Sequence, residues 1–372
     1  MNNPIPTLNV QQLESLIQFH SHGVEELKHS LAAEESRIDP SASPLLGDEH
    51  HQNVLRAFEA SQAACGRFES EHQSESELIK SAQKAFLENT NPEFEQSWIA
   101  QRARTKPHGF VGDYEMLIKL YDEKTPATGL GGYLDLCILD LPLARAVRTR
   151  LKAARQFLLK EIEQRGDKVS ILDVASGPCR EYRDWPEFAE KEVSVVAMDT
   201  DPHALEFVQS NVCPTIPRGT TLRPVRYNAL RTSVAEGTIR LFGKFDVIYS
   251  VGLCDYLTDD QLVRMFAAWK ETLNDGGVMY VAFKDCQQYD HIPYQWHMDW
   301  FFFQRTFDDA LSLFAKAGID TSEMEITRDE TGIIINFIYR KPGTNHHRID
   351  AAEAINPHLP IENAAIEIRS EV

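Results

Sequence analysis

The chain has 372 residues, and its 56 acidic side chains outnumber 38 basic ones, which gives a formal net charge of −18. Binding to nucleic acid depends largely on lysines and arginines that neutralise phosphates, so this balance argues against nucleic acid and against an anionic membrane surface as partners. With 42% hydrophobic and 25% charged residues, the composition is that of a globular protein with a sizeable core, in one large domain or two smaller ones.

No run of eighteen apolar residues occurs, and the start, MNNPIPTLNVQQLES, lacks the basic and then apolar pattern of a secretory signal. We therefore expect a cytoplasmic protein without integral membrane association. The 6 cysteines form no CxxC pair, which favours reduced thiols over disulfides or a structural zinc site. The pairs His50/His51 and His346/His347 lack acidic or Cys partners at ligand spacing, so no metal is expected. The sequence leaves the oligomeric state open.

The first half of the sequence predicts helices. Residues 1–50 contain a short amphipathic pattern and end in the turn-rich IDPSASPLLGDEHH, which indicates a helical N-terminal arm followed by a loop. Over 51–164, apolar residues recur at every third or fourth position, which predicts a domain of helices packed on one side, including MLIKLYDE and a helix that ends near 162. Two segments with glycines, TKPHGFVGDYE and TPATGLGG, are predicted turns.

The second half alternates strands with helices, which predicts an α/β fold: a parallel sheet with helices on both faces. The predicted strands are 169–174, 193–199, 222–227, 245–250 and 278–284, and the predicted helices lie near 180–190, 202–211, 231–241, 259–273 and 306–317. Two further strands, 324–327 and 333–340, flank the tight-turn sequence RDETG and predict an antiparallel terminal hairpin. This domain spans 165–341, and 342–372 is interpreted as a surface tail.

The segment VSILDVASGPCRE predicts a ligand seat at the end of the first strand. The strand ends in Asp173, and the small residues Ala175, Ser176 and Gly177 allow a ligand to approach the backbone closely. A dinucleotide fingerprint, GxGxxG, is not matched, because two of its three glycine positions are occupied by other residues. A diphosphate cradle is therefore not expected.

The second strand ends in Asp199, within AMDTDP. A carboxylate at this place can accept hydrogen bonds from both hydroxyls of a ribose. The alternative is that Asp199 and Asp201 only cap the helix that begins at Pro202, a role for which Asp201 is well placed.

Two more strands end at the same predicted edge of the sheet. Asn228 and Ala229 follow the third strand, where an amide or backbone N–H can meet an adenine edge. The strand FDVIYS ends at Ser250 and opens into a loop that contains Gly252 and Tyr256. Since ligands of open α/β sheets lie across the carboxyl ends of the strands, these residues are candidates for one nucleoside site.

In this order and spacing, LDVASGP, AMDTDP, Asn228-Ala229, FDVIYSVGL and LNDGGVMYVAF resemble the motifs of class I S-adenosylmethionine-dependent methyltransferases, over about residues 165–340. The resemblance implies an enzyme with a Rossmann-like, seven-stranded methyltransferase sheet and S-adenosyl-L-methionine as cofactor. The usual DxGxGxG motif is altered, with Ala175 and Cys179 in place of two glycines. The cofactor-binding residues that the resemblance implies are Asp173, Ala175, Ser176, Gly177 and Arg180 around the methionine part, Asp199 and Thr200 at the ribose, Asn228 and Ala229 at the adenine, and Ser250 and Gly252 near the sulfonium.

A narrower resemblance covers more of the chain. The segments KPHGFVGDYEMLIKLYD, AVRTRLKAARQ, ASGPCREY, VGLCDYLTD and HMDWFFFQRT are similar to the methyltransferases of extracellular-factor, 3-hydroxy fatty acid methyl ester biosynthesis. That type carries a helical N-terminal half with a KPxGYxGDYE-like motif, and here Phe110 and His108 replace the usual tyrosine and a common arginine. The resemblance implies O-methylation of the carboxylate of a 3-hydroxy fatty acid.

The acceptor decides which catalytic residues are needed. A carboxylate is ionised at neutral pH and needs no general base, whereas an amine or phenol needs one, for which His291, His297 and Asp113 are candidates. The segment IPYQWHMDWFFFQRTF either lines an acyl-chain site or packs the helical half onto the sheet. The candidate catalytic residues are Asp113, Tyr114 and His297, and the candidate acceptor-binding residues are Phe110, Tyr256, His291, Trp296 and Trp300.

Several alternatives stay open from the sequence. The loop GFVGDYE either closes over the cofactor, with Asp113 and Tyr114 facing the ligand, or forms a turn in which Asp113 caps the next helix. Arg180 either pairs with the methionine carboxylate or with Glu181 or Asp184. Other functions are N- or O-methylation of another small metabolite, or non-catalytic binding of S-adenosylmethionine by a regulator; the missing glycines disfavour a nicotinamide-dependent oxidoreductase.

Overall fold

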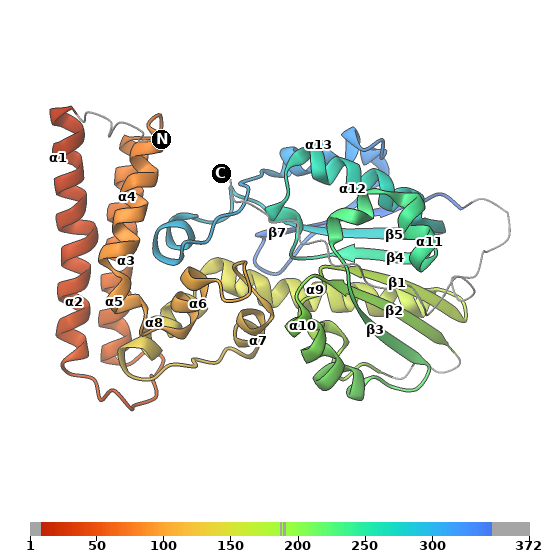
Figure 1. The fold of residues 1–372 in the computed structure, drawn as a ribbon, viewed down its shortest axis with the longest axis horizontal. Helices are drawn as coiled ribbons and strands as arrows, with labels where there is room; N and C mark the ends of the chain where they lie inside the picture. The colour runs from red at the N-terminus through yellow and green to blue at the C-terminus, as the bar shows by residue number, and fades with distance from the viewer. Residues whose placement is uncertain (1–8, 187, 189–190, 344–372) are drawn as a thin grey trace.

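The computed structural model describes residues 9–186, 188 and 191–343. The predicted tail lies outside the described residues except for 342 and 343, as does the pair His346/His347. The helices of residues 10–94 gather at one end of an elongated molecule, and the sheet forms the other end (Figure 1). No helix within the described residues is both long enough and apolar enough to cross a membrane.

The N-terminal helices form an antiparallel hairpin. Helix α1 (Val10–Phe19) runs through a π-helical segment, η1 (His20–Glu25), into α2 (Glu26–Glu35), which packs along α3 (Glu49–Glu71). Phe19 and Phe68 bring their ring centroids to 4.9 Å across this contact. The following helices are α4 (Ser76–Asn89), α5 (Asn91–Phe94), α6 (Trp98–Thr105), α7 (Tyr114–Asp122), α8 (Gly129–Leu139) and α9 (Pro142–Gln164).

The prediction of a turn over TPATGLGG is partly wrong, because α8 begins at Gly129 within this segment. Gly131 and Gly132 serve a close helix contact instead. A Cβ at Gly131 would lie 2.0 Å from the Gln96 carbonyl oxygen, and one at Gly132 would lie 2.7 Å from the Ala127 carbonyl oxygen. Close packing against Gln96 therefore explains Gly131, and close packing against Ala127 and Pro44 explains Gly132.

The second half forms a seven-stranded sheet in the order β3-β2-β1-β4-β5-β7-β6. Strands β1 to β5 are parallel, and β7 pairs antiparallel with both β5 and β6. This arrangement confirms the predicted fold class, including the terminal hairpin. The strands are β1 (Lys168–Val174), β2 (Glu192–Asp199), β3 (Thr220–Arg226), β4 (Phe245–Ser250), β5 (Leu273–Lys284), β6 (Glu325–Arg328) and β7 (Ile334–Arg340).

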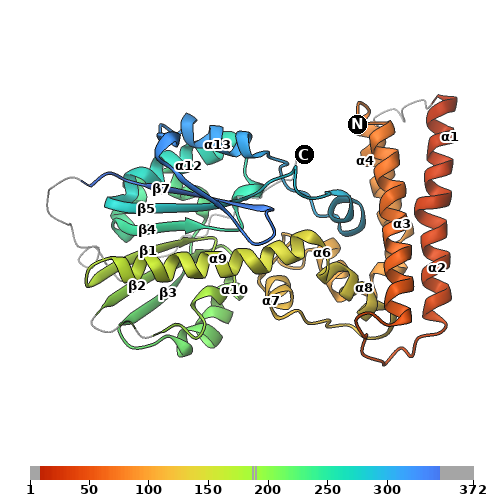
Figure 2. The same cartoon turned by 180° about the vertical axis from the view of Figure 1, so that it is seen from behind.

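Two hydrophobic cores cover the two faces of the sheet, as the alternation of strand side chains requires. Ile171 and Val195 belong to the core shared with α9, whereas Leu172 and Val196 belong to the core shared with α12 and α13. Figure 2 shows α9 lying across its face of the sheet. The elements between the strands are α10 (Pro202–Phe207), η3 (Val208–Val212), η4 (Cys213–Thr215), η5 (Ala229–Ser233), α11 (Ala235–Phe242), η6 (Cys254–Tyr256), α12 (Asp259–Thr272), η7 (Pro293–His297), α13 (Phe307–Lys316) and η8 (Thr321–Glu323).

The helix predicted over 180–190 is wrong for the residues of this range that the structure describes, 180–186 and 188. These form only a short 3-10 turn, η2 (Arg180–Tyr182), and Asp184 takes a left-handed φ of 52°. Arg155 on α9 donates to the carbonyl oxygens of Glu181, Arg183 and Asp184 at 2.6, 2.7 and 3.0 Å. A helix would direct these carbonyls along its own axis, so the side chain from α9 stabilises an irregular path instead.

Candidate cofactor and acceptor site

The loop after β1 keeps a glycine-like backbone despite its altered motif. Ala175, Gly177 and Cys179 all have left-handed φ values, of 60°, 53° and 50°. These are the three glycine positions of DxGxGxG, and two of them carry side chains that disfavour this conformation by about 1–2 kcal/mol each. Ser176 N–H donates to the Met198 carbonyl oxygen over 3.0 Å, which holds the loop against β2. Strained residues of this kind are typical of ligand sites.

The acid at the end of β2 lies against this loop. Asp199 Oδ2 accepts a hydrogen bond from Gly177 N–H over 2.8 Å, and its Oδ1 accepts one from Asp201 N–H over 2.9 Å. Burial raises the pKa of the Asp199 carboxyl. Asp201 is the residue that caps α10, since its Oδ1 accepts from His203 N–H over 2.9 Å. Asp199 therefore holds the loop after β1, whereas Asp201 caps α10. Thr200, between the two aspartates, is exposed.

A buried acidic cluster lies beneath the loop, on the face of the sheet covered by α9. Asp173 is the next-to-last residue of β1, and Glu181 follows on η2; both are buried. The Tyr249 hydroxyl donates to Glu181 Oε1 over 2.7 Å, and it lies 2.8 Å from the Tyr182 hydroxyl. Burial raises the pKa of both carboxyl groups, and the neighbouring Glu181 carboxylate raises that of Asp173 further. A cation bound at the ligand seat would therefore favour the ionised forms of these two carboxyl groups.

Arg150 on α9 belongs to the same region, although the sequence analysis did not identify it. Its side chain is only 5% exposed, and a Cβ at Gly252 would lie 3.5 Å from its Nη2. Within the described part of the chain its Nε has no hydrogen-bond partner, and its charge acts against burial on the pKa of the nearby Tyr121 and Glu181 side chains. An arginine in AVRTRLKAARQ carries no sequence signal of its own, because several arginines recur along this helix. A buried guanidinium with spare donors is suited to bind a carboxylate.

The ends of β4 and β5 meet in a second polar contact. Asp255, in the loop after β4, forms a buried ion pair with Lys284 at the end of β5 and accepts from its backbone N–H over 3.2 Å. Burial lowers the pKa of Lys284. The Lys284 ammonium also lies 4.5 Å from the centroid of the Phe302 ring. The cation is thus held at the border between the sheet and an aromatic segment.

Two predicted acceptor residues, Tyr256 and Trp300, and the loop that carries a third, Phe110, lie together beside this contact. Trp300 Nε1 donates to the Tyr256 hydroxyl over 2.7 Å. A Cβ at Gly112 would lie 2.8 Å from Trp300 Cζ2, so the glycine lets the GFVGDYE loop lie on the indole ring. Phe110 in that loop is 41% exposed, and the glycines on both sides of it have left-handed φ values of 86° and 73°.

An apolar cavity of about 30 Å³ lies where α6, α7, α8 and α9 meet the segment after β5. Lys284 is the only charged residue among those that line it. The volume is close to that of one water molecule or methyl group. The lining residues are Ile99, Leu120, Ile138, Leu143, Ala144, Val147, Lys284, Tyr294, Met298, Trp300 and Phe302.

Other predicted cofactor residues hold the edge of the sheet together. The Ser250 hydroxyl is buried and donates to the Val174 carbonyl oxygen over 2.8 Å, so it joins the ends of β4 and β1. Asn228 Oδ1 accepts from Leu230 N–H over 2.9 Å and caps η5, and Ala229 next to it is buried. Arg180 forms an ion pair with Asp122 on α7, a partner that neither sequence alternative included.

Asp113 is positioned as a helix cap, the second of the two roles that the sequence left open. It is buried, its Oδ1 accepts from Met116 N–H over 3.0 Å, and Arg102 Nε donates to both of its oxygens over 2.8 Å. These contacts favour the capping role over the catalytic one. The ring of Tyr114 lies 5.5 Å from that of His108 and 5.6 Å from that of Phe207, and burial raises its pKa to about 12.

The structure does not bring His297, Trp296 and His291 to the edge of the sheet. His297 is completely buried, with its ring centroid 4.9 Å from Phe58 and 4.8 Å from Phe86, and burial lowers its pKa to about 3. Trp296 Nε1 donates to Glu69 on α3 over 2.7 Å, and His291 Nε2 lies 2.5 Å from the same carboxylate. These three residues join the segment after β5 to the N-terminal helices, which favours the packing role that the sequence left open for this segment over a role in acceptor binding or catalysis.

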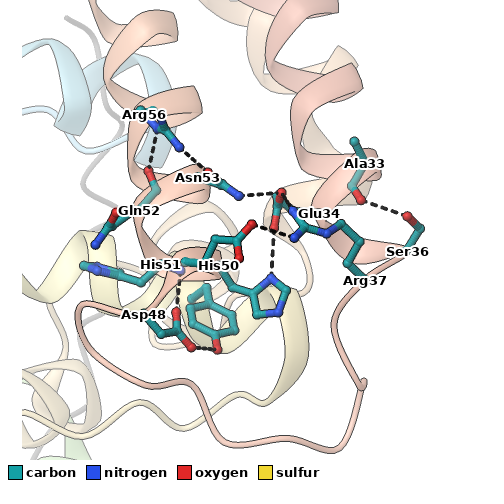
Figure 3. A network of polar contacts seen from close by, with 12 residues as sticks. Ala33, Glu34, Ser36, Arg37, Asp48, His50, His51, Gln52, Asn53 and Arg56 are labelled. Carbon is teal, nitrogen blue, oxygen red and sulfur yellow. Dashed lines mark hydrogen bonds and ion pairs between the residues drawn. The ribbon is translucent and has the colours of Figure 1, made fainter.

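The N-terminal hairpin contains a separate polar network, shown in Figure 3. Glu34 on α2 accepts hydrogen bonds from Arg37 and Asn53 over 2.7 and 2.8 Å, and His50 Nδ1 lies 2.9 Å from its other oxygen. His50 therefore has an acidic partner, contrary to the sequence analysis, because α2 and α3 are antiparallel. A cavity of about 450 Å³ lies between these helices, far along the chain from the sheet.

Comparisons with known proteins find likeness in structure only. No family model matches the chain, and no curated protein matches it. A solved structure described as a possible exported protein from Bordetella parapertussis has a TM-score of 0.55 and 16% identity, and the match covers 91% of this chain and 100% of that one. Magnesium protoporphyrin IX methyltransferase from Synechocystis PCC 6803 with bound SAH has a TM-score of 0.40 and 10% identity, covering 54% of this chain and 86% of that one. A methyltransferase from Methanosarcina mazei described as SAM-dependent has a TM-score of 0.38 and 14% identity, covering 50% and 98%. At 16% identity, the first likeness concerns the fold alone.

Proposed function

We propose that this protein is an S-adenosylmethionine-dependent methyltransferase that acts on a small molecule. The observation that carries the proposal is the contact between the loop after β1 and the acid that ends β2, where Gly177 N–H donates to Asp199 Oδ2 over 2.8 Å. A loop that permits close backbone approach and a carboxylate thus lie side by side at the sheet edge where α/β folds bind ligands. The carboxylate offers acceptors for the hydroxyls of one ribose.

The surroundings of this contact fit a cationic ligand. Asp173 and Glu181 are buried next to the loop, and burial raises the pKa of both carboxyl groups, so a cation bound beside them would favour their ionised forms. When bound, S-adenosylmethionine supplies an electrophilic methyl group on a sulfonium. The task of the protein is to hold the nucleophile in line with that methyl group and to exclude water. Helix α7 covers the loop for this purpose, since a Cβ at Gly177 would lie 3.5 Å from Leu117 Cδ1.

We further propose that the acceptor is a carboxylate with an apolar chain, and specifically a 3-hydroxy fatty acid. Arg150 Nε has no hydrogen-bond partner within the described residues, and Lys284, which is paired with Asp255, lies at the wall of the apolar cavity. Both observations support an anionic group with hydrocarbon beside it. A carboxylate oxygen forms its new bond to carbon as the methyl group leaves sulfur, so no proton has to be removed. This agrees with the commitment of Asp113 to capping and of His297 to packing.

The cavity sets a requirement on acceptor binding. Its volume of about 30 Å³ holds a methyl group but not an acyl chain. A longer chain can enter only if the contact between Trp300 and Tyr256 opens, because Trp300 forms part of the wall. The exposed loop around Phe110, with a glycine at each side, lies on that indole ring and can move with it.

The proposal is tested with the purified full chain, S-adenosylmethionine and a panel of acceptors. The panel contains 3-hydroxy fatty acids, the same acids without the hydroxyl group, and fatty amines of equal length. We expect release of S-adenosylhomocysteine and a mass increase of one methyl group for the 3-hydroxy acids. Methylation of the amines alone would contradict the carboxylate acceptor, and cofactor binding without turnover on any acceptor or on cell extract would favour a regulator. Absence of heat on titration with S-adenosylhomocysteine would contradict the cofactor itself.

A further inference from the structure

A cluster of metal-ligating side chains lies beside the proposed ribose acid, outside the residues assigned above. His108 is on the loop between α6 and α7, Asp201 caps α10, and His203 is the second residue of α10. One donor atom from each of the three side chains lies within 4.8 Å of the other two. This is the spacing of ligands around a single metal ion.

One oxygen in the cluster is buried without a hydrogen bond. Asp201 is 5% exposed; its Oδ1 accepts from His203 N–H, whereas its Oδ2 has no hydrogen-bond partner among the described residues. His108 Nδ1 approaches this oxygen to 2.9 Å, but the contact is not aligned as a hydrogen bond. A buried carboxylate oxygen without a partner is costly, and a cation between the oxygen and the imidazole nitrogen would satisfy both.

The chemistry of the donors selects the kind of ion. Two imidazoles and one carboxylate suit divalent ions of the later first transition series, such as Zn²⁺ and Co²⁺, better than Mg²⁺ or Ca²⁺, which prefer oxygen ligands. His108 is partly exposed, and His203 is exposed, so an ion can reach the cluster from solvent. The remaining coordination positions would be left to water.

We propose that His108, Asp201 and His203 bind one divalent transition-metal ion of the Zn²⁺ type. The bound ion fastens the loop that carries Phe110 to the N-terminal end of α10. The loop begins near Lys106, which has a left-handed φ of 49°, and it contains Gly109 and Gly112, so it has several points at which it can bend. Because Asp201 donates its backbone N–H to Asp199, the ion would also stiffen the segment that holds the proposed ribose acid. The site itself does not depend on the proposed methyltransferase activity.

The test uses untagged, chelator-treated full-length protein. Binding of Zn²⁺ is measured by calorimetry, and binding of Co²⁺ by its visible absorption. We expect one site per chain, and we expect His203→Ala and His108→Ala each to weaken its affinity by at least about tenfold, the lower end of effects on a ligand shell. The double variant His346→Ala, His347→Ala is the matched control, since it removes two adjacent histidines elsewhere in the sequence, and it should bind as the wild type does.

His203 is exposed, so its replacement tests the ligand without disturbing the core. Hydrogen exchange of the amides of residues 106–113 provides a second readout, and we expect Zn²⁺ to slow it in the wild type and in the control but not in His203→Ala. Equal affinity of wild type and His203→Ala for both ions would overturn the proposal. Loss of metal binding only in the double variant His346→Ala, His347→Ala would assign the ion to that pair of histidines and would also overturn the proposal.

Discussion

The segments 173–199 and 291–302 both contain residues that the sequence analysis predicted to be functional. Strand pairing positions these residues in the first segment, whereas side-chain packing positions them in the second. In the first, Asp173 and Asp199 lie at strand ends, and their position follows from parallel pairing with a neighbour. In the second, Trp296 and His297 turn into the N-terminal helices, whereas Trp300 turns toward Tyr256 at the sheet. Strand ends are thus a dependable guide to a site, and an aromatic run is not, because its partners lie far away in the sequence.

The largest expected effect tests whether His297 is a packing residue. His297→Ala should lower the free energy of unfolding by about 3–5 kcal/mol, the usual cost of removing a large ring from a core. The reason is that its ring packs against Phe58, Phe86 and Phe94, and Ser61 Oγ lies 3.2 Å from its Nε2. Denaturant unfolding measures the loss. His297→Phe keeps the ring and should retain kcat with the acceptor; a large loss of kcat in this folded variant would restore a catalytic role.

The pH dependence of stability sharpens the same point. The pKa of His297 is lowered to about 3 by burial, below the value near 6.5 expected in the unfolded chain. Below that value the unfolded chain binds an extra proton, so the stability present at neutral pH is lost as the pH falls from about 6.5 toward 3, by up to a few kcal/mol. Unfolding free energies at several pH values should fall less steeply in His297→Phe. Parallel curves for the two proteins would mean that this histidine does not contribute to acid sensitivity.

Arg150 allows the comparison to be extended to a residue that no motif identifies. Arg150→Met keeps the length of the side chain but removes the donors beside Gly252, and we expect it to weaken carboxylate binding by about 1.5–3 kcal/mol. Two measurements distinguish the carboxylate involved: the dissociation constant of S-adenosylhomocysteine reports on the cofactor, and KM reports on the acceptor. Arg145→Met, at an exposed position on the same helix, is the control. If Arg150→Met changes neither constant, the guanidinium does not bind a carboxylate.

Asp199→Ala tests the strand end from which the cofactor site is built. We expect cofactor affinity to fall by about 1–3 kcal/mol, because the ribose loses a charged acceptor and Gly177 N–H loses its partner. Calorimetry with S-adenosylhomocysteine measures the change. Asp320→Ala removes an exposed capping aspartate from η8 and serves as the control. Affinity equal to that of the wild type in Asp199→Ala would remove the ribose assignment.

The sequence predicted the strands well, because each is a buried apolar run with a clear end. It could not predict the irregular path after Cys179, since that path depends on Arg155 of α9, and it interpreted Gly131 as a turn residue because the chain at Gln96 is distant in sequence. Candidate cofactor residues at strand ends were found from local patterns. Arg150 and the cluster of His108 and His203 were missed, because only the fold brings these residues together.

The smallest expected effect concerns the strain in the loop after β1. Ala175 has a φ of 60°, a conformation that glycine adopts without the penalty of about 1–2 kcal/mol that other residues incur. Part of this gain is offset because glycine has more freedom in the unfolded chain, so Ala175→Gly should raise the free energy of unfolding by less than about 1 kcal/mol. Gly237→Ala, at a partly exposed position of α11, is the matched control with the reverse substitution, since a helix favours alanine there by about 1 kcal/mol. If Ala175→Gly lowers stability as much as a glycine in a helix does, then the loop does not follow the left-handed path, and the argument that an altered motif keeps its backbone would fail with it.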